Sequence, residues 1–121
     1  MNPTTEIRHV GDVTIVDLHG RIVLGEESAA LRVLIRDLLN QGNKKILLNL
    51  SDVNYIDSSG LGHLVSSFTS VRKQGGELKL LKLTNKVHDL LQVTRLYTVF
   101  DIQEEEPAAV LSFGEATAAT A

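Results

Sequence analysis

The spacing of apolar residues along the chain predicts alternating strands and helices. Glu6–Val10 and Val13–Leu18 have the length and composition of two short strands, joined in a hairpin at Gly11 and Asp12. From Glu26 the period changes to steps of three and four residues, which indicates an amphipathic helix that stops near Gly42. Further helices are predicted to start near Gly60, at Thr84 and near Glu104, and further strands to cover 45–50, 77–81 and 99–102.

The order of these elements predicts the fold class. Strands alternate with helices after residue 20, which argues for a mostly parallel sheet, and the opening hairpin makes that sheet mixed. Lys45–Leu50 is almost continuously apolar, as is typical of a strand covered on both faces. We therefore predict a small single α/β domain over residues 1–113, with an N-terminal hairpin and about four helices. The small, polar tail at 114–121 has nothing to bury, and we expect it to be disordered.

Composition narrows the classes of function. The 121 residues are 43% hydrophobic, which suits one compact domain. A net charge of -3, scattered basic residues and only 4% aromatic residues argue against nucleic-acid binding. No apolar run approaches the ~20 residues that span a bilayer. The N-terminus does not resemble a signal peptide, so we expect a cytoplasmic protein without a membrane partner.

The motifs of common enzyme classes are incomplete in this chain. The absence of cysteine excludes disulfides and thiolate metal sites. Gly60–Val65 lacks the third glycine of a dinucleotide fingerprint, and Ser58 is not part of a Gly-x-Ser-x-Gly elbow. The histidines are isolated, without the spacing of a zinc site, and His63 fits an ordinary position on a helix. We expect no enzymatic activity, no cofactor and no metal.

The segment Asp57-Ser58-Ser59-Gly60-Leu61-Gly62 puts two glycines into the first turn of a predicted helix. Each glycine inside a helix costs roughly 1 kcal/mol relative to alanine. A helix N-cap explains Ser58 or Ser59, and tight packing explains one glycine, but neither explains both glycines. A first turn without side chains would let another protein come close to the Ser58 hydroxyl. We therefore interpret the segment as a functional site.

Around this segment, the chain from about Glu6 to Ser112 resembles the STAS domain family, specifically its anti-sigma factor antagonist branch. "KQGGELKLL" and "LLQVTRLYTVF" support the match. The resemblance implies a switch: an anti-sigma factor that is also a serine kinase phosphorylates the first serine after the motif aspartate. That serine is Ser58 here, and Ser59 is the alternative acceptor. The unmodified protein would bind the anti-sigma factor and free the sigma factor, and a serine phosphatase would restore the phosphorylated form.

The resemblance also implies a partner-binding surface. The surface would comprise Asp57, Ser58, Ser59, Gly60, Leu61 and Gly62, together with Arg21. Arg21 is a departure, because relatives often carry an acid after "LHG". We expect a monomer or weak dimer. The alternative function is a STAS scaffold, or a ligand-sensing or lipid-transport accessory module, which a basic or apolar patch around the helix after the motif would favour.

Overall fold

The computed structural model describes residues 5–22 and 26–120, with side chains for 5–20 and 30–113. In chain order the elements are β1 (Thr5–Val10), β2 (Val13–Ile22), α1 (Glu26–Asn40), β3 (Lys45–Ile56), α2 (Ser58–Lys73), β4 (Glu77–Leu81), α3 (Asn85–Val93), β5 (Asp101–Gln103) and α4 (Glu106–Thr120). The strands form one sheet in the order β1-β2-β3-β4-β5. β1 is antiparallel to β2, and the other pairs are parallel, so the predicted mixed α/β fold is confirmed.

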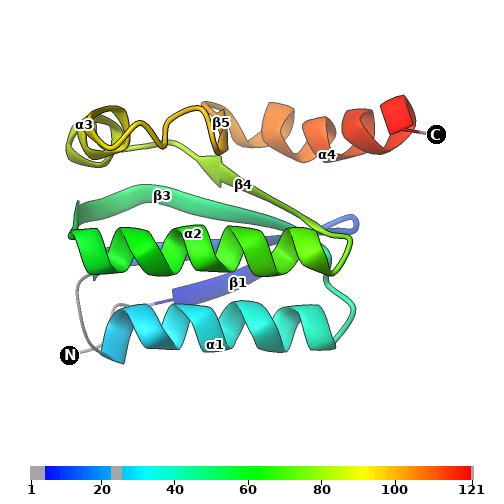
Figure 1. Cartoon of the computed structure of the whole chain (residues 1–121). Coiled ribbons are helices and arrows are strands. Elements are labelled where there is room, and N and C mark those ends of the chain that lie inside the picture. The colour runs from blue at the N-terminus through cyan, green and yellow to red at the C-terminus, as the bar shows by residue number, and fades with distance from the viewer. Residues whose placement is uncertain (1–4, 23–25, 121) are drawn as a thin grey trace.

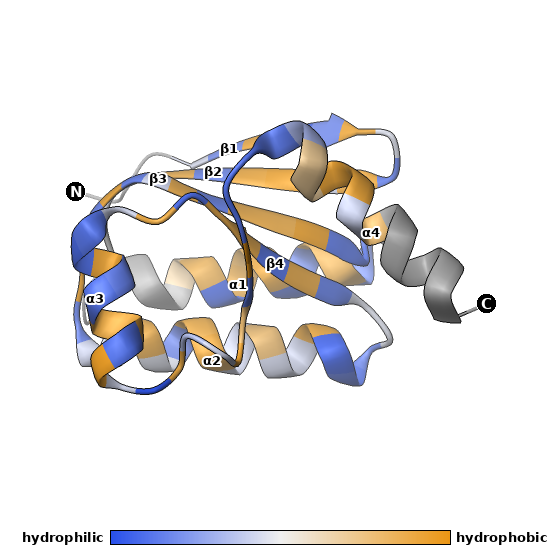
Figure 2. Cartoon of the chain, turned by 90° about the horizontal axis from the view of Figure 1, so that it is seen from above, coloured by the Kyte–Doolittle hydropathy of each residue, from blue (hydrophilic) through white to orange (hydrophobic). Residues whose placement is uncertain are grey.

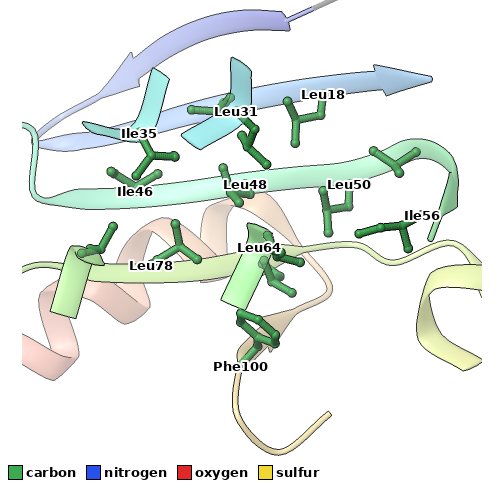
Figure 3. Close-up of a cluster of buried hydrophobic side chains, with 14 of the residues drawn as sticks. Leu18, Leu31, Ile35, Ile46, Leu48, Leu50, Ile56, Leu64, Leu78 and Phe100 are labelled. Carbon is green, nitrogen blue, oxygen red and sulfur yellow. The ribbon is translucent and has the colours of Figure 1, made fainter. Parts of the chain in front are cut away.

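Helices cover both faces of the sheet. α1 and α2 lie side by side along one face, and α4 lies against the other (Figures 1 and 2). The larger core forms between the sheet, α1, α2 and α3, and it includes Leu48 and Leu64 (Figure 3). The smaller core lies under α4 and contains Leu47 and Phe113. Consecutive residues of β3 therefore enter different cores, which confirms the prediction of a strand covered on both faces.

Two strands run further than the hydrophobic pattern predicts. β2 continues past Leu18, the end predicted from the sequence, to Ile22, and its pairing with β3 shifts register twice. Gly20 has a φ of 98° in this stretch, a conformation that glycine adopts without strain. β3 continues past Leu50 to Ile56. The extension carries the chain directly to the start of α2, so the end of β3 lies next to the predicted functional segment.

The remaining helix ends agree with the sequence. Gly75, with a φ of 78°, follows the end of α2, and Glu106 and Pro107 begin α4 as predicted. α4 is assigned through Thr120, over the tail for which the composition predicts disorder. Because no side chain is described beyond Phe113, that disorder stays a prediction. None of the helices in the described ranges has both the length and the apolar character required to cross a membrane.

Candidate functional site

The N-terminus of α2 is capped by the aspartate of the predicted functional segment. β3 ends at Ile56 and α2 begins at Ser58, so Asp57 occupies the N-cap with extended backbone angles (φ −97°, ψ 178°). Its Oδ1 accepts a hydrogen bond of 2.7 Å from the Gly60 amide. The prediction that Ser58 or Ser59 caps the helix is therefore wrong. Aspartate caps as well as serine does, and the end of β3 delivers Asp57 to the cap position.

Capping by Asp57 leaves the hydroxyl of Ser58 available to a partner. Ser58 is exposed and Ser59 is half-buried. Among the described residues, neither hydroxyl has a hydrogen-bond partner. A kinase must bring its nucleotide against the acceptor oxygen, so the difference in exposure favours Ser58 over Ser59.

Substitutions at Asp57 should separate capping from a role in the switch. Asp57→Ala is expected to lower the free energy of unfolding by about 1 kcal/mol, because the Gly60 amide loses its acceptor. Asp57→Asn keeps an oxygen at the same place and should retain most of the stability. Urea unfolding followed by circular dichroism measures both. If Asp57→Asn is stable but poorly phosphorylated by the serine kinase that the sequence predicts as a partner, the carboxylate also acts in the predicted switch; normal phosphorylation restricts Asp57 to the cap.

The two glycines of the segment lie in different environments. Gly60 is buried, and its neighbour Leu61 is 4% exposed in the larger core, so both pack the first turn of α2 against the domain. Gly62 is exposed, and a Cβ added to it would have no heavy atom within 4 Å. Packing can account for Gly60 but not for Gly62. Partner contact stays a prediction for the exposed positions of this turn, Ser58 and Gly62.

Replacing Gly62 should therefore stabilise the domain and weaken partner binding. Gly62→Ala is expected to raise the free energy of unfolding by up to about 1 kcal/mol, since alanine is the better helix former. It should also weaken partner binding by covering the turn beside Ser58. Gly76→Ala is the contrasting control, because its Cβ would lie 2.5 Å from the Lys44 carbonyl oxygen and should destabilise the domain. Unaltered binding by a stabilised Gly62→Ala chain would show that no partner packs on this turn.

An open groove of about 660 Å³ lies beside Ser58. We call it the Ser58 groove; it is lined by Tyr55, Ile56, Asp57, Ser58, Lys86, Asp89, Leu90 and Val93. Its first four residues come from the end of β3 and the start of α2, and the other four come from α3. Val93 is 81% exposed and Tyr55 is 40% exposed, so two large apolar side chains flank the serine. Such a surface can supply the apolar contacts of a protein interface.

The α3 side of the groove is absent from the binding surface predicted from sequence. α3 itself is correctly predicted; Val87 and Leu91 are buried in it, and Leu90 is half-buried. Val93 is an apolar residue of this helix that lies outside its buried face. An apolar residue at such a position was the one feature of the sequence that indicated the α3 side of the groove. Thr84, the residue before α3, anchors the helix start to the sheet by donating a hydrogen bond of 2.8 Å to the Val53 carbonyl. This contact holds α3 opposite the serine.

The structure describes two other residues that the sequence singles out, Arg21 in its backbone alone and His63 in full. Arg21 pairs with Tyr55 in the β2–β3 register, so its backbone is next to a groove residue, but its side chain is outside the described residues. His63 is half-buried on α2 and does not line the groove. Within the described ranges, no three histidine, aspartate or glutamate side chains gather where a metal ion could be held.

An ionic cluster that the sequence did not predict crosses the first three strands. His19 on β2 contacts Asp52 on β3 through Nδ1 at 2.6 Å, and Glu6 on β1 through Nε2 at 3.1 Å. The prediction that the histidines are isolated is therefore wrong for His19. Its hydrogen bond to Asp52, with a smaller contribution from Glu6, raises the pKa of the imidazole. The register that places His19 opposite Asp52 could not be derived from spacing alone.

The raised pKa of His19 predicts that its contribution to stability falls as pH rises. Two carboxylates favour the protonated ring in the folded state, whereas an unfolded histidine titrates near 6.5. The contribution is complete below that value and is lost as pH rises through the folded-state pKa. The stability difference between the wild-type chain and His19→Gln should shrink as pH rises above about 6.5. Urea unfolding across this range measures it; Asp52→Asn should flatten the dependence, and a difference that grows with pH would contradict it.

Comparison with protein families gives a match over most of the chain. The family model described as STAS domain matches residues 4–109. Among curated proteins, the chain is 33% identical over 110 residues to the anti-sigma-B factor antagonist of Bacillus subtilis (strain 168). That alignment covers 91% of this chain and 99% of the relative.

Solved structures show the same architecture. Protein TM1081 from Thermotoga maritima gives a TM-score of 0.83 at 30% identity, covering 90% of this chain and 93% of its own. An anti-sigma factor antagonist from Mycobacterium paratuberculosis gives a TM-score of 0.78 at 18% identity, covering 93% and 94% of the two chains. The second likeness shows a shared fold.

Proposed function

The chain belongs to the STAS domain family, and from this membership we propose that it is an anti-sigma factor antagonist that phosphorylation of Ser58 switches off. In the proposed cycle, the unphosphorylated chain binds an anti-sigma factor that is also a serine kinase, and the sigma factor is freed. The phosphorylated chain no longer binds, and a serine phosphatase restores it. The protein acts by binding and catalyses no step itself.

The observation that carries this proposal is the exposed hydroxyl of Ser58 beside an apolar groove. Ser58 is the first residue of α2 and has no capping duty, because Asp57 caps the helix. Tyr55 and Val93 stand exposed in the lining of the same groove. A partner seated on the Ser58 groove would bury the hydroxyl together with these two side chains. A charge added at Ser58 would then lie inside the interface.

The domain itself should tolerate a phosphate on Ser58. Free amides and the positive end of the α2 dipole favour an anion at this position by a few tenths to ~1 kcal/mol. The neighbouring carboxylate of Asp57 opposes the phosphate, and salt weakens that repulsion. The two effects nearly offset each other, so we propose that the switch blocks a surface with little refolding. Amide chemical shifts of the phosphorylated chain should change around the groove; a global rearrangement would contradict the proposal.

The proposal is tested by locating the phosphate. The chain is incubated with ATP and candidate anti-sigma factor kinases from the same genome, and mass spectrometry identifies the modified residue. We expect phosphate on Ser58, its loss in Ser58→Ala, and its retention in the matched variant Ser59→Ala. A Ser58→Ala chain that incorporates phosphate at the normal rate would overturn the assignment.

A further inference from the structure

A second hollow, separate from the Ser58 groove, lies between helices α1 and α2. This α1–α2 cleft has a volume of about 290 Å³. Its polar lining comes from Arg32 and Arg36 on α1 and from Ser67, Ser70 and Gln74 on α2. Figure 1 shows the two helices running side by side on the same face of the sheet. Nothing in the proposed partner switch uses these residues.

Both charged side chains in the described lining of the α1–α2 cleft are basic. Arg32 and Arg36 are four residues apart, so they project from the same side of α1. Both are exposed, and neither forms an ion pair or hydrogen bond with a described residue. No carboxylate is among the described residues that line the cleft. Two like charges at this spacing destabilise a helix, and a bound anion would relieve their repulsion.

The cleft also contains an unsatisfied buried hydroxyl. Ser67 is 3% exposed, and its Oγ is the one buried side-chain polar atom without a hydrogen-bond partner in the described part of the chain. By contrast, the hydroxyl of Thr69 on the same helix donates to the Val65 carbonyl at 3.1 Å. A hydroxyl on a helix can thus donate to a backbone carbonyl of the preceding turn, and the hydroxyl of Ser67 does not. A buried polar group without a partner weakens the fold, which points to a partner that binds in the cleft.

The α2 side of the cleft carries further hydrogen-bond donors besides Ser67. Ser67, Ser70 and Gln74 follow one another at steps of three and four residues, so they line one face of α2. The hydroxyls and the amide can each donate a hydrogen bond, and the guanidinium groups opposite donate in a planar fork. Apolar side chains such as Leu39 complete the wall. Guanidinium groups together with neutral hydrogen-bond donors are typical of sites that recognise phosphate oxygens.

We propose that the α1–α2 cleft binds a phosphate group, carried by a small metabolite or by a lipid headgroup. Arg32 and Arg36 hold the phosphate oxygens, and Ser70 and Gln74 contribute neutral hydrogen bonds. Ser67 turns its hydroxyl toward the anion when the cleft is filled. Ser67 lies nine residues after Ser58 along α2, about 14 Å at 1.5 Å per residue, so this site does not depend on the serine switch.

The test is a titration of the full isotope-labelled chain with inorganic phosphate at constant ionic strength, with chloride as the reference anion. We expect saturable amide shifts along the facing sides of α1 and α2, with a Kd of about 1 mM or tighter. Arg36→Gln should weaken binding at least about tenfold, because one charge-assisted contact is lost. Ser67→Ala should weaken it less and leave the melting temperature equal or higher. Arg72→Gln is the matched control, since Arg72 stacks over Phe68 with its Cζ 5.7 Å from the ring centroid.

Vesicles distinguish the two sources of the phosphate group. Flotation with phosphatidic acid vesicles that depends on Arg36 would assign the site to a lipid headgroup, and saturable binding of free phosphate alone would assign it to a soluble metabolite. Binding that is equal for phosphate and chloride, or equal in Arg36→Gln and the wild-type chain, overturns the proposal. Ser58→Glu should bind phosphate as the wild-type chain does. If the α1–α2 cleft does not bind phosphate, the proposed partner switch is therefore unaffected.

Discussion

Phosphorylation of Ser58 is expected to weaken binding to the anti-sigma factor about a thousandfold, which is about 4 kcal/mol at 1.4 kcal/mol per decade. The phosphate adds ≈ -1.5 to -2 charge at pH 7. Asp57 and Asp89 already line the Ser58 groove, and Lys86 is the one basic residue in its described lining. A dianion buried there would lose its water without gaining an adequate counter-ion. Calorimetric titration of the modified and unmodified chains against the anti-sigma factor measures the difference.

A matched pair of charge substitutions separates a local block from a general effect of charge. Ser58→Glu should reproduce most of the loss of binding with little change in the free energy of unfolding. Thr69→Glu adds the same charge to an exposed position three turns along α2 and should leave binding nearly unchanged. If Ser58→Glu binds the anti-sigma factor as tightly as the unaltered chain, the blocking mechanism is wrong. If Thr69→Glu is equally impaired, overall charge and not the groove controls the interaction.

Helices α1, α2 and α3 were predictable because their apolar residues recur at steps of three and four residues, whereas α4 was predictable from the acidic residues and the proline at its start. The period of three and four residues marked α1, in which Leu31, Ile35 and Leu38 are buried. The extensions of β2 and β3 were not predictable in the same way. Beyond Leu18 and Leu50 the two strands pair mainly with each other and shift register, so the alternation of polar and apolar residues is interrupted.

The candidate site was only partly visible in the sequence, because it joins segments that lie far apart along the chain. The motif located the exposed serine and the start of α2. Two capping residue types stood next to each other, so the sequence could not decide that Asp57, and not Ser58, occupies the N-cap. Lys86 and Val93 reach the groove only through the docking of α3. The approach of His19 to Asp52 likewise depends on a strand register that spacing alone does not specify.

The largest loss of stability is expected from Phe113→Ala, which should lower the free energy of unfolding by about 3–5 kcal/mol. Phe113 is 0% exposed and is the largest side chain of the core under α4, where it packs with Ile15 and Leu47. The Lys79 ammonium lies 4.9 Å from its ring centroid, so the truncation also removes a cation–π contact. Urea unfolding measures the change, which is a large part of the roughly 5–15 kcal/mol available to a typical domain.

Leu111→Ala is the matched control, because Leu111 lies two residues earlier on α4 and is 66% exposed. It should change the free energy of unfolding by no more than about 0.5 kcal/mol. A chain ending at Phe113 should keep the full stability, because the composition of 114–121 offers nothing to bury. Equal losses from Phe113→Ala and Leu111→Ala would show that α4 does not seal the second face of the sheet. A large loss on truncation would instead move the domain boundary beyond residue 113.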